Sequence, residues 1–265
     1  NDRAHAQHDA EYWRERGLHR LRHRTVSLDV GTDALTVVVR SGAAAGQSAY
    51  LTTYHWTADD DALRLHVATE PTGYWPERTD VYGEAMVDPD LPDERRRELE
   101  ARDKAPSLGR LGLRWLLPES WSQVAWFGAG PGEAYPDSRA AARIGRFRAT
   151  LDELQTPYVR PQENGNRAEV RWAEVTEPNG TGLRIEADPL INLAVRRYAD
   201  QQLAHARHQH DLTPEPVIYL HTDHAVQGLG SASVGPAALP QHRLTVQSAE
   251  FSLTLSATFW PPAGT

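Results

Sequence analysis

The sequence of 265 residues predicts an all-β fold, a large antiparallel β-sandwich with a few short helices. Segments in which apolar and polar residues alternate recur along most of the chain, and this is the pattern of half-buried strands. These segments follow one another with only turns between them, so the strand–helix–strand order of a parallel α/β fold or a TIM barrel is absent. Two antiparallel sheets packed face to face are the architecture that such a pattern favours.

The first third of the chain predicts one short helix followed by four strands. Residues 6–17 have the composition of a short helix. The four strands alternate apolar and polar side chains, and the first two form a hairpin around Gly31. They are expected at residues 24–30, 34–40, 49–56 and 63–69.

A charged segment at residues 88–105 interrupts this series of strands. We expect it to be a surface insertion within a single domain that spans residues 1–265, and not a domain boundary. A solvated helix is predicted to begin near Pro92. Acidic residues come early in it and arginines later, an order that suits the helix dipole.

The remainder of the chain predicts further strands and only one more short helix, at residues 201–207. The last predicted strand alternates cleanly over nine positions, FSLTLSATF. The strands of this part are expected at residues 111–116, 123–127, 168–175, 183–187, 191–197, 217–220, 243–246 and 251–259.

The composition excludes several classes of protein. A net charge of −8 makes nonspecific phosphate binding unfavourable, so we expect no nucleic-acid partner. No run approaches the roughly 20 apolar residues of a membrane span, so we expect no membrane partner. The absence of cysteine rules out disulfides, thiolate nucleophiles and zinc–sulfur sites. Neither a G-x-S-x-G nucleophile motif nor a P-loop is present.

Three other groups of residues leave alternatives open. Eight tryptophans suit either a sugar site, where rings stack on pyranose faces, or the core of a large sandwich. The clustered histidines favour ordinary hydrogen bonding over a metal site, because no H-E-x-x-H spacing occurs, and we expect no metal in this chain. Glycoside hydrolysis needs two carboxylates about 5–5.5 Å apart in a retaining enzyme. Glu133, Glu163 and Asp188 are the best-placed candidates, and the sequence selects no pair among them.

Several motifs carry a resemblance to a known family. Residues 126–137 (WFGAGPGEAYPD) and 158–167 (YVRPQENGNR) resemble two signatures of the last domain of bacterial lactose-type β-galactosidases, in glycoside hydrolase family 2. Residues 208–212 and 221–230 are similar to two further motifs of that domain, in the same order. The resemblance covers essentially residues 1–260, and it implies a galactose-mutarotase-like supersandwich.

The resemblance also implies a function for the chain as part of a larger enzyme. The parent enzyme would hydrolyse terminal β-D-galactose residues, with its catalytic glutamates in an upstream TIM-barrel domain. The family's acid/base glutamate follows an asparagine, and this chain contains no Asn-Glu pair, so no catalytic residue is expected in it. The isolated chain is predicted to be inactive and to contact β-galactoside or galactose only through the parent enzyme.

Other expectations concern the surroundings of the chain. We expect no cofactor in it, although the parent enzyme would use magnesium or sodium in other domains. The upstream barrel is the expected partner, and homo-oligomerisation of the complete enzyme stays open. The expected location is cytoplasmic.

Two groups of residues are candidates for contact with substrate. In the family, a loop after the G-x-G motif carries a tryptophan that stacks on the sugar, and here Ser233 and Val234 occupy that place. The second group is a polar cluster of Glu163, Asn164, Arg167 and His210. It either faces sugar or forms a buried network between strands, and the second interpretation is favoured because buried polar groups are normally hydrogen-bonded.

Two other functions remain as alternatives. One is a stand-alone carbohydrate-binding module. The other is an aldose 1-epimerase-like enzyme, which would use a carboxylate and a histidine for ring opening.

Overall fold

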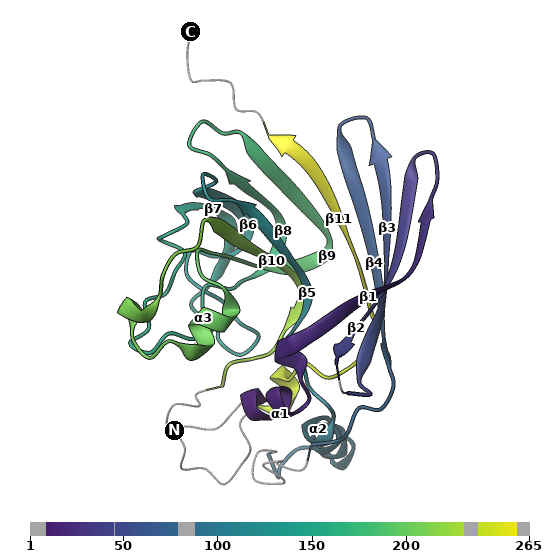
Figure 1. Cartoon of the computed structure of the whole chain (residues 1–265). Helices are drawn as coiled ribbons and strands as arrows, with labels where there is room; N and C mark the ends of the chain where they lie inside the picture. Colours follow the sequence, from purple (N-terminus) through teal and green to yellow (C-terminus); the bar gives the residue numbers. More distant parts are fainter. Residues whose placement is uncertain (1–8, 45, 79–87, 231–237, 259–265) are drawn as a thin grey trace.

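The computed structural model describes residues 9–44, 46–78, 88–230 and 238–258, and within these ranges it contains eleven β-strands. All pairings between them are antiparallel, which confirms the predicted all-β class. Figure 1 shows two facing layers, with β1 to β4 in one and β5 to β8 and β10 in the other.

The first layer is a meander of four strands joined by hairpins. These strands are β1 (Leu21–Val30), β2 (Ala34–Ala43), β3 (Ala49–Asp59) and β4 (Ala62–Thr72). Strand β11 (Ala249–Thr258), which comes last among the described strands, pairs with β4 and extends this layer. The four strands predicted in the first third of the chain are therefore confirmed, each a few residues longer than expected.

The second layer contains the strands from the middle of the chain. They are β5 (Arg110–Pro118), β6 (Gln123–Gly130), β7 (Arg143–Thr150), β8 (Arg167–Thr176) and β10 (Val217–Val226). Strand β7 was not predicted from the sequence. It lies at the edge of the sheet, where β6 is its hydrogen-bonded neighbour.

Strand β9 (Gly182–Arg196) joins the two layers. Its first half pairs with β11, with Asp188 opposite Ser252, and its second half pairs with β10, with Arg196 opposite Tyr219. The sequence predicts two strands here, at 183–187 and 191–197. The structure instead has one strand of 15 residues, because Pro189 lies within a continuous strand.

The main hydrophobic core lies between the layers. Strand alternation turns Leu65 and Val67 of β4 inward, and each is at most 2% exposed. Ile218 and Leu220 of β10 are fully buried on the opposing side. Trp126 of β6 is 1% exposed in the same core, and its indole nitrogen donates to the Ala129 carbonyl. At least this tryptophan is a core residue.

Three short α-helices accompany the strands: α1 (Asp9–Glu15), α2 (Asp93–Lys104) and α3 (Asp200–His205). Helix α2 confirms the helix predicted in the charged insertion, with acidic residues in its first turn and basic residues in its last. It is docked and not merely solvated, because Leu99 and Asp103 are buried. The Asp103 carboxylate lies 3.1 Å from the Arg243 guanidinium, and both side chains are at most 3% exposed.

One predicted strand is wrong. Residues 243–246 follow a short 3-10 turn and form only an isolated bridge, between Thr245 and Ser107. Their apolar side chains, Leu244 and Val246, pack in a small separate cluster with Tyr50. The alternating apolar residues that predicted a strand are therefore buried in this local cluster without forming a strand.

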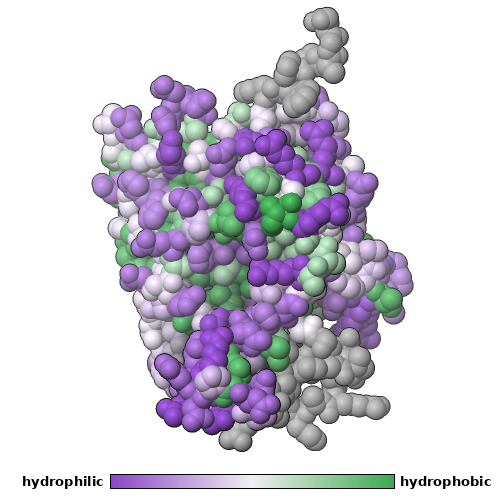
Figure 2. Space-filling model, turned by 180° about the vertical axis from the view of Figure 1, so that it is seen from behind, coloured by the Kyte–Doolittle hydropathy of each residue, from purple (hydrophilic) through white to green (hydrophobic). Residues whose placement is uncertain are grey.

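The far side of the molecule is mostly hydrophilic, with hydrophobic residues in small groups, as Figure 2 shows. In the part of the chain that the structure describes, no helix is long and apolar enough to cross a membrane.

Candidate functional site

A network of charged residues lies on the face of β10 that is turned away from the core. Side chains alternate between the two faces of a strand, so the inward Ile218 and Leu220 leave Tyr219, His221 and Asp223 on the other face. The neighbouring strands also contribute arginines to that face, Arg196 from β9 and Arg110 and Arg114 from β5. Two loops close over it, and they belong to the segments that resemble family signatures.

Glu163 is the centre of this network. Its carboxylate accepts hydrogen bonds from Arg196, from Arg110 at 2.6 Å and from the Tyr135 hydroxyl at 3.0 Å. Arg196 comes from β9, Arg110 from the start of β5, and Tyr135 from the loop after β6. Glu163 therefore connects its own loop to two strands and a second loop.

The two arginines extend the network to β10 and α3. Arg110 also faces the His221 Nδ1 atom at 2.7 Å and donates to Asp223 at 3.1 Å. Arg196 donates to Asp200, in the first turn of α3, at 2.8 Å. Three members of the network are buried: the side chains of Arg196, Asp223 and His221 are at most 3% exposed.

The charges shift one another's protonation in definite directions. Burial and, to a smaller extent, the nearby Arg110 together lower the pKa of His221 to about 2, so the imidazole is neutral. Burial raises the pKa of Asp223 to about 6 although Arg110 opposes the shift. Burial also acts to raise the pKa of Glu163, but Arg196 and Arg110 outweigh it and lower the pKa, so this carboxylate stays ionised.

Three side chains of the network are partly exposed, so a ligand could reach them. Glu163 is 32% exposed, Arg110 26% and Asp200 36%. These three side chains present carboxylate acceptors and guanidinium donors at the surface, which is the set that binds sugar hydroxyls. The same groups are already engaged with one another, so a sugar would compete with existing ion pairs.

A second cluster fixes the loop that carries Glu163. The Glu133 carboxylate accepts from the Tyr158 hydroxyl, from Thr156 Oγ1 at 3.0 Å and from the Gly165 backbone at 2.9 Å. The Asn164 side chain accepts from the Thr156 backbone at 3.2 Å, and the residue is 1% exposed. Glu133 and Asn164 therefore hold this loop in one shape.

Arg167 is likewise occupied by the protein itself. Its guanidinium donates to the carbonyl oxygens of Gly165 at 2.7 Å and Pro131 at 3.1 Å. It also lies 5.4 Å from the ring centroid of Trp126. Burial lowers its pKa, although Glu133 acts in the opposite direction. These contacts describe a buried arginine that joins two loops to the core.

His210 does not lie in this network. Its side chain is 80% exposed, its ring stacks on that of His208, and its charged neighbour is Asp211 at 3.5 Å. The structure thus brings together Glu163, Asn164 and Arg167 in adjoining clusters and leaves His210 at the surface. The other candidates, Ser233 and Val234, lie outside the described residues.

The beginning of the loop that carries Ser233 and Val234 is described, and Asp137 holds it. The Asp137 carboxylate accepts backbone hydrogen bonds from Leu229 at 3.0 Å and Gly230 at 2.7 Å. A Cβ on Gly228 would lie 2.6 Å from the same carboxylate, so the close approach requires glycine there. Asp137 ends the first family-like signature, which therefore contacts the fourth.

Sequence reasoning weighed His221 and Asp223 only with the clustered histidines, and it grouped none of the other network members with Glu163: Arg110, Tyr135, Arg196, Asp200, His221 and Asp223. Two of them had a local signal, because Arg110 and Arg196 are charges at the ends of strongly apolar strands. Their common partner Glu163 is far away in sequence, and only the strand pairing brings it close.

The network is poorly suited to acid–base chemistry. An epimerase needs a carboxylate and a histidine that exchange protons near neutral pH. Glu163 is held ionised between two arginines, and His221 is buried and neutral. Among the described residues, no group of three or more His, Cys, Asp or Glu side chains could hold a metal ion.

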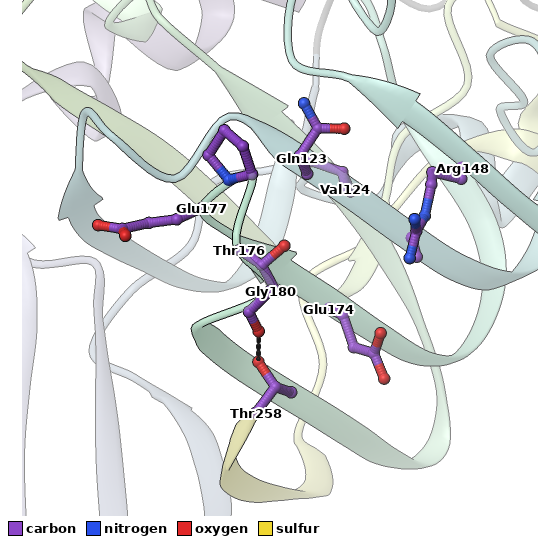
Figure 3. A pocket seen from close by; sticks show the side chains of 10 residues that line it. Gln123, Val124, Arg148, Glu174, Thr176, Glu177, Gly180 and Thr258 are labelled. Carbon is purple, nitrogen blue, oxygen red and sulfur yellow. Dashed lines mark hydrogen bonds between the residues drawn. The ribbon is translucent and has the colours of Figure 1, made fainter. Parts of the chain in front are cut away.

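A separate depression of about 580 Å³ lies at one end of the sheet (Figure 3). Gln123, Arg148 and Glu174 point toward it, and Thr258 donates to the Gly180 carbonyl at its edge. It contains no residue of the Glu163 network and none of the candidates predicted from the sequence.

The fold defines the class of protein, which is an antiparallel all-β protein. Ion pairs on the outer face of its sheet hold the two loops that resemble family signatures. The family described as beta galactosidase small chain matches residues 1–255, and this chain belongs to that family.

Similar curated proteins are much longer than this chain. A β-galactosidase of Arthrobacter sp. (strain B7) is 31% identical over 253 residues, which are 94% of this chain and 22% of that protein. A β-galactosidase of Vibrio vulnificus (strain YJ016) is 32% identical over 244 residues, 91% of this chain and 20% of that protein. The chain therefore spans about a fifth of the length of these relatives.

Solved structures resemble the chain more distantly. A putative aldose 1-epimerase from Escherichia coli K12 has a TM-score of 0.40 and 13% identity, covering 90% of this chain and 69% of that one. A galactose mutarotase related enzyme from Lactobacillus acidophilus has a TM-score of 0.37 and 4% identity, covering 89% and 70%. Similarity at this level says nothing about the function of this chain.

Proposed function

We propose that this chain is the small-chain part of a β-galactosidase that hydrolyses terminal β-D-galactose residues. In this proposal it packs beside a catalytic barrel carried by the rest of the polypeptide and lines one side of the sugar cleft. The catalytic glutamates belong to the barrel and not to this chain. Ser233 and Val234 contact the sugar. The network around Glu163 and the cluster around Glu133 hold the loops that approach the cleft.

The observation that carries the proposal is the family match over residues 1–255, together with relatives named β-galactosidase of which the chain spans about a fifth. The Glu163 network supports a scaffolding role, because Arg110 and Arg196 pair with the Glu163 carboxylate and hold it ionised. We further propose a cytoplasmic location and no cofactor bound by this chain.

Activity measurements on separate and combined polypeptides test the proposal. The chain alone is expected to leave o-nitrophenyl β-D-galactoside uncleaved, and the complete polypeptide that includes a barrel is expected to cleave it. Removing residues 1–265 from the complete polypeptide should abolish hydrolysis, and adding the chain back should restore part of it.

Two results would overturn the proposal. Cleavage by the chain alone would place catalytic groups within it. A complete polypeptide that does not act on galactosides, combined with galactose binding by the chain alone, would identify a carbohydrate-binding module instead.

A further inference from the structure

The apolar inner face of the first layer extends beyond the core onto β2 and β1. Strand register places residues of five neighbouring strands in two rows on this face. From β11 to β1, one row is Leu253, Leu65, Trp56, Leu35 and Val30. The other row is Phe251, Val67, Tyr54, Val37 and Leu28. Every position in both rows is apolar or aromatic.

Burial falls steadily along each row toward β1. Leu253 and Leu65 are each 1% exposed, whereas Val30, at the end of their row, is 71% exposed. Leu28 ends the other row at 61% exposed. Nothing in the described ranges covers these two side chains to any large extent. In Figure 1 the hairpin of β1 and β2 forms the right-hand flank of the molecule.

The other face of the same strands is polar. The row beside the first two runs through Ser252, His66, His55, Thr36 and Asp29, with hydrogen bonds between His66 and Ser252 and between Thr36 and His55. In a strand that faces water on both sides, apolar and polar residues are not expected to separate onto opposite faces. The alternation therefore marks the inner face of β1 and β2 as a face to be covered.

We propose that this face docks against the remainder of the β-galactosidase polypeptide. We call it the β1–β2 apolar strip, and it consists of Leu28, Val30, Leu35 and Val37. The inference rests on the proposed function and names the surface through which the chain meets its partner.

Three observations select this occupant. About four-fifths of the length of each relative lies outside the part that this chain matches, so a large partner could cover the strip. The strip carries no charge and continues the core directly, which is typical of permanent interfaces and not of transient ones. Extension of the sheet by a second copy is disfavoured, because β1 has Arg22 and Arg24 and a bulge between Thr25 and Ser27, features that oppose edge pairing.

Cysteine labelling of the complete polypeptide tests the docking. The chain has no cysteine, so a single one is introduced as Val30→Cys or Leu28→Cys in the strip. Asp29→Cys is the matched control, because it lies between them on the same strand and faces the polar side. All three positions are exposed in the chain itself, so none of the variants should impair folding.

The readout is the rate of maleimide labelling of each introduced cysteine, measured by peptide mass spectrometry and divided by its rate in denaturant. In the complete polypeptide, Val30→Cys and Leu28→Cys are expected to react about tenfold or more slower than Asp29→Cys, because reaction needs local opening of the interface. Hydrolysis of o-nitrophenyl β-D-galactoside is measured on the same samples.

Equal labelling of the strip and control cysteines in a hydrolytically active sample would overturn the docking while the proposed function stands. Protection that disappears on dilution would assign the strip to a second copy and also overturn the proposal. Slow labelling of the strip in a sample without hydrolysis would support docking to a neighbouring part of the polypeptide, while the proposed function fails.

Discussion

Replacing Glu163 with glutamine tests whether its carboxylate holds strands and loops together. The change removes the negative charge between Arg110 and Arg196 and keeps the size of the side chain. Arg196, which is 1% exposed, then has Asp200 as its remaining carboxylate partner. Hydrogen bonds to charged groups contribute roughly 1.5–3 kcal/mol each, and the one-third exposure of Glu163 reduces this value.

From these contacts we expect Glu163→Gln to lower the free energy of unfolding by about 2 kcal/mol at pH 7. For a chain of this size, that corresponds to a fall in Tm of about 4–8 °C. Urea and thermal unfolding followed by circular dichroism measure both quantities. Glu98→Gln is the matched control, because Glu98 pairs with Arg95 on the exposed face of α2 and should change stability by less than about 0.5 kcal/mol.

The effect should depend on pH in one direction. The folded-state pKa of Glu163 lies below its unfolded value, so its stabilisation is present above the unfolded pKa and is lost as the pH falls through the folded one. The difference in the free energy of unfolding between wild type and Glu163→Gln should therefore become smaller as the pH falls. An unchanged Tm, combined with an altered KM for galactoside in the complete enzyme, would refute the structural role and make Glu163 a sugar ligand.

Three further changes have expected outcomes. Gly112→Ala should destabilise by about 3 kcal/mol or more in urea unfolding, because its Cβ would lie 2.3 Å from the Asp223 Cα. Asp103→Ala should lower the free energy of unfolding by about 3–5 kcal/mol, because it leaves a buried guanidinium without its carboxylate. Helix α2 should then undock, and trypsin should cleave its backbone after the arginines. In wild type, the raised folded pKa of Asp223, about 6, should make the free energy of unfolding fall as the pH rises from about 4 to 6. Asp223→Asn should remove this fall.

Each of the three variants has a control or a result that would contradict its prediction. A Cβ on Gly132 would meet nothing within 4 Å, so Gly132→Ala should leave the unfolding curve unchanged, and equal effects of the two glycine variants would contradict the packing argument. Unaltered trypsin resistance of α2 in Asp103→Ala would show that the ion pair does not dock the helix. If the variant Asp223→Asn keeps the same pH slope as wild type, another group causes that slope.

Local alternation predicted most of the fold because both layers are antiparallel and each has a buried face. Strand β7 was missed because its outward side chains include Arg146 and Arg148, so the segment has a hydrophobic content below that of the other strands. The break predicted within β9 was wrong because Pro189 lies where the strand passes from one layer to the other. In both places the position within the sheet, and not the local sequence, decided the outcome.

The candidate site was less predictable. The motif that contains Glu163, Asn164 and Arg167 was evident in the sequence, but the partners of Glu163 were not. Arg110 lies 53 residues from Glu163 and Arg196 lies 33 residues away, so their contact depends on the pairing of distant strands. His210 was grouped with them from its motif alone, and the motif does not encode that its side chain points to solvent.

The position of β11 has a consequence for how the chain is made. Strand β11 is the described strand that connects β4 to β9, so the first four strands have no hydrogen-bonded link to the second layer until it arrives. During synthesis, residues 249–258 leave the ribosome after the other ten strands that the structure describes. Until then β4 and β9 each present an open edge, and such edges associate readily with other chains. A polypeptide truncated before residue 249 should therefore collect in aggregates instead of persisting as two folded halves.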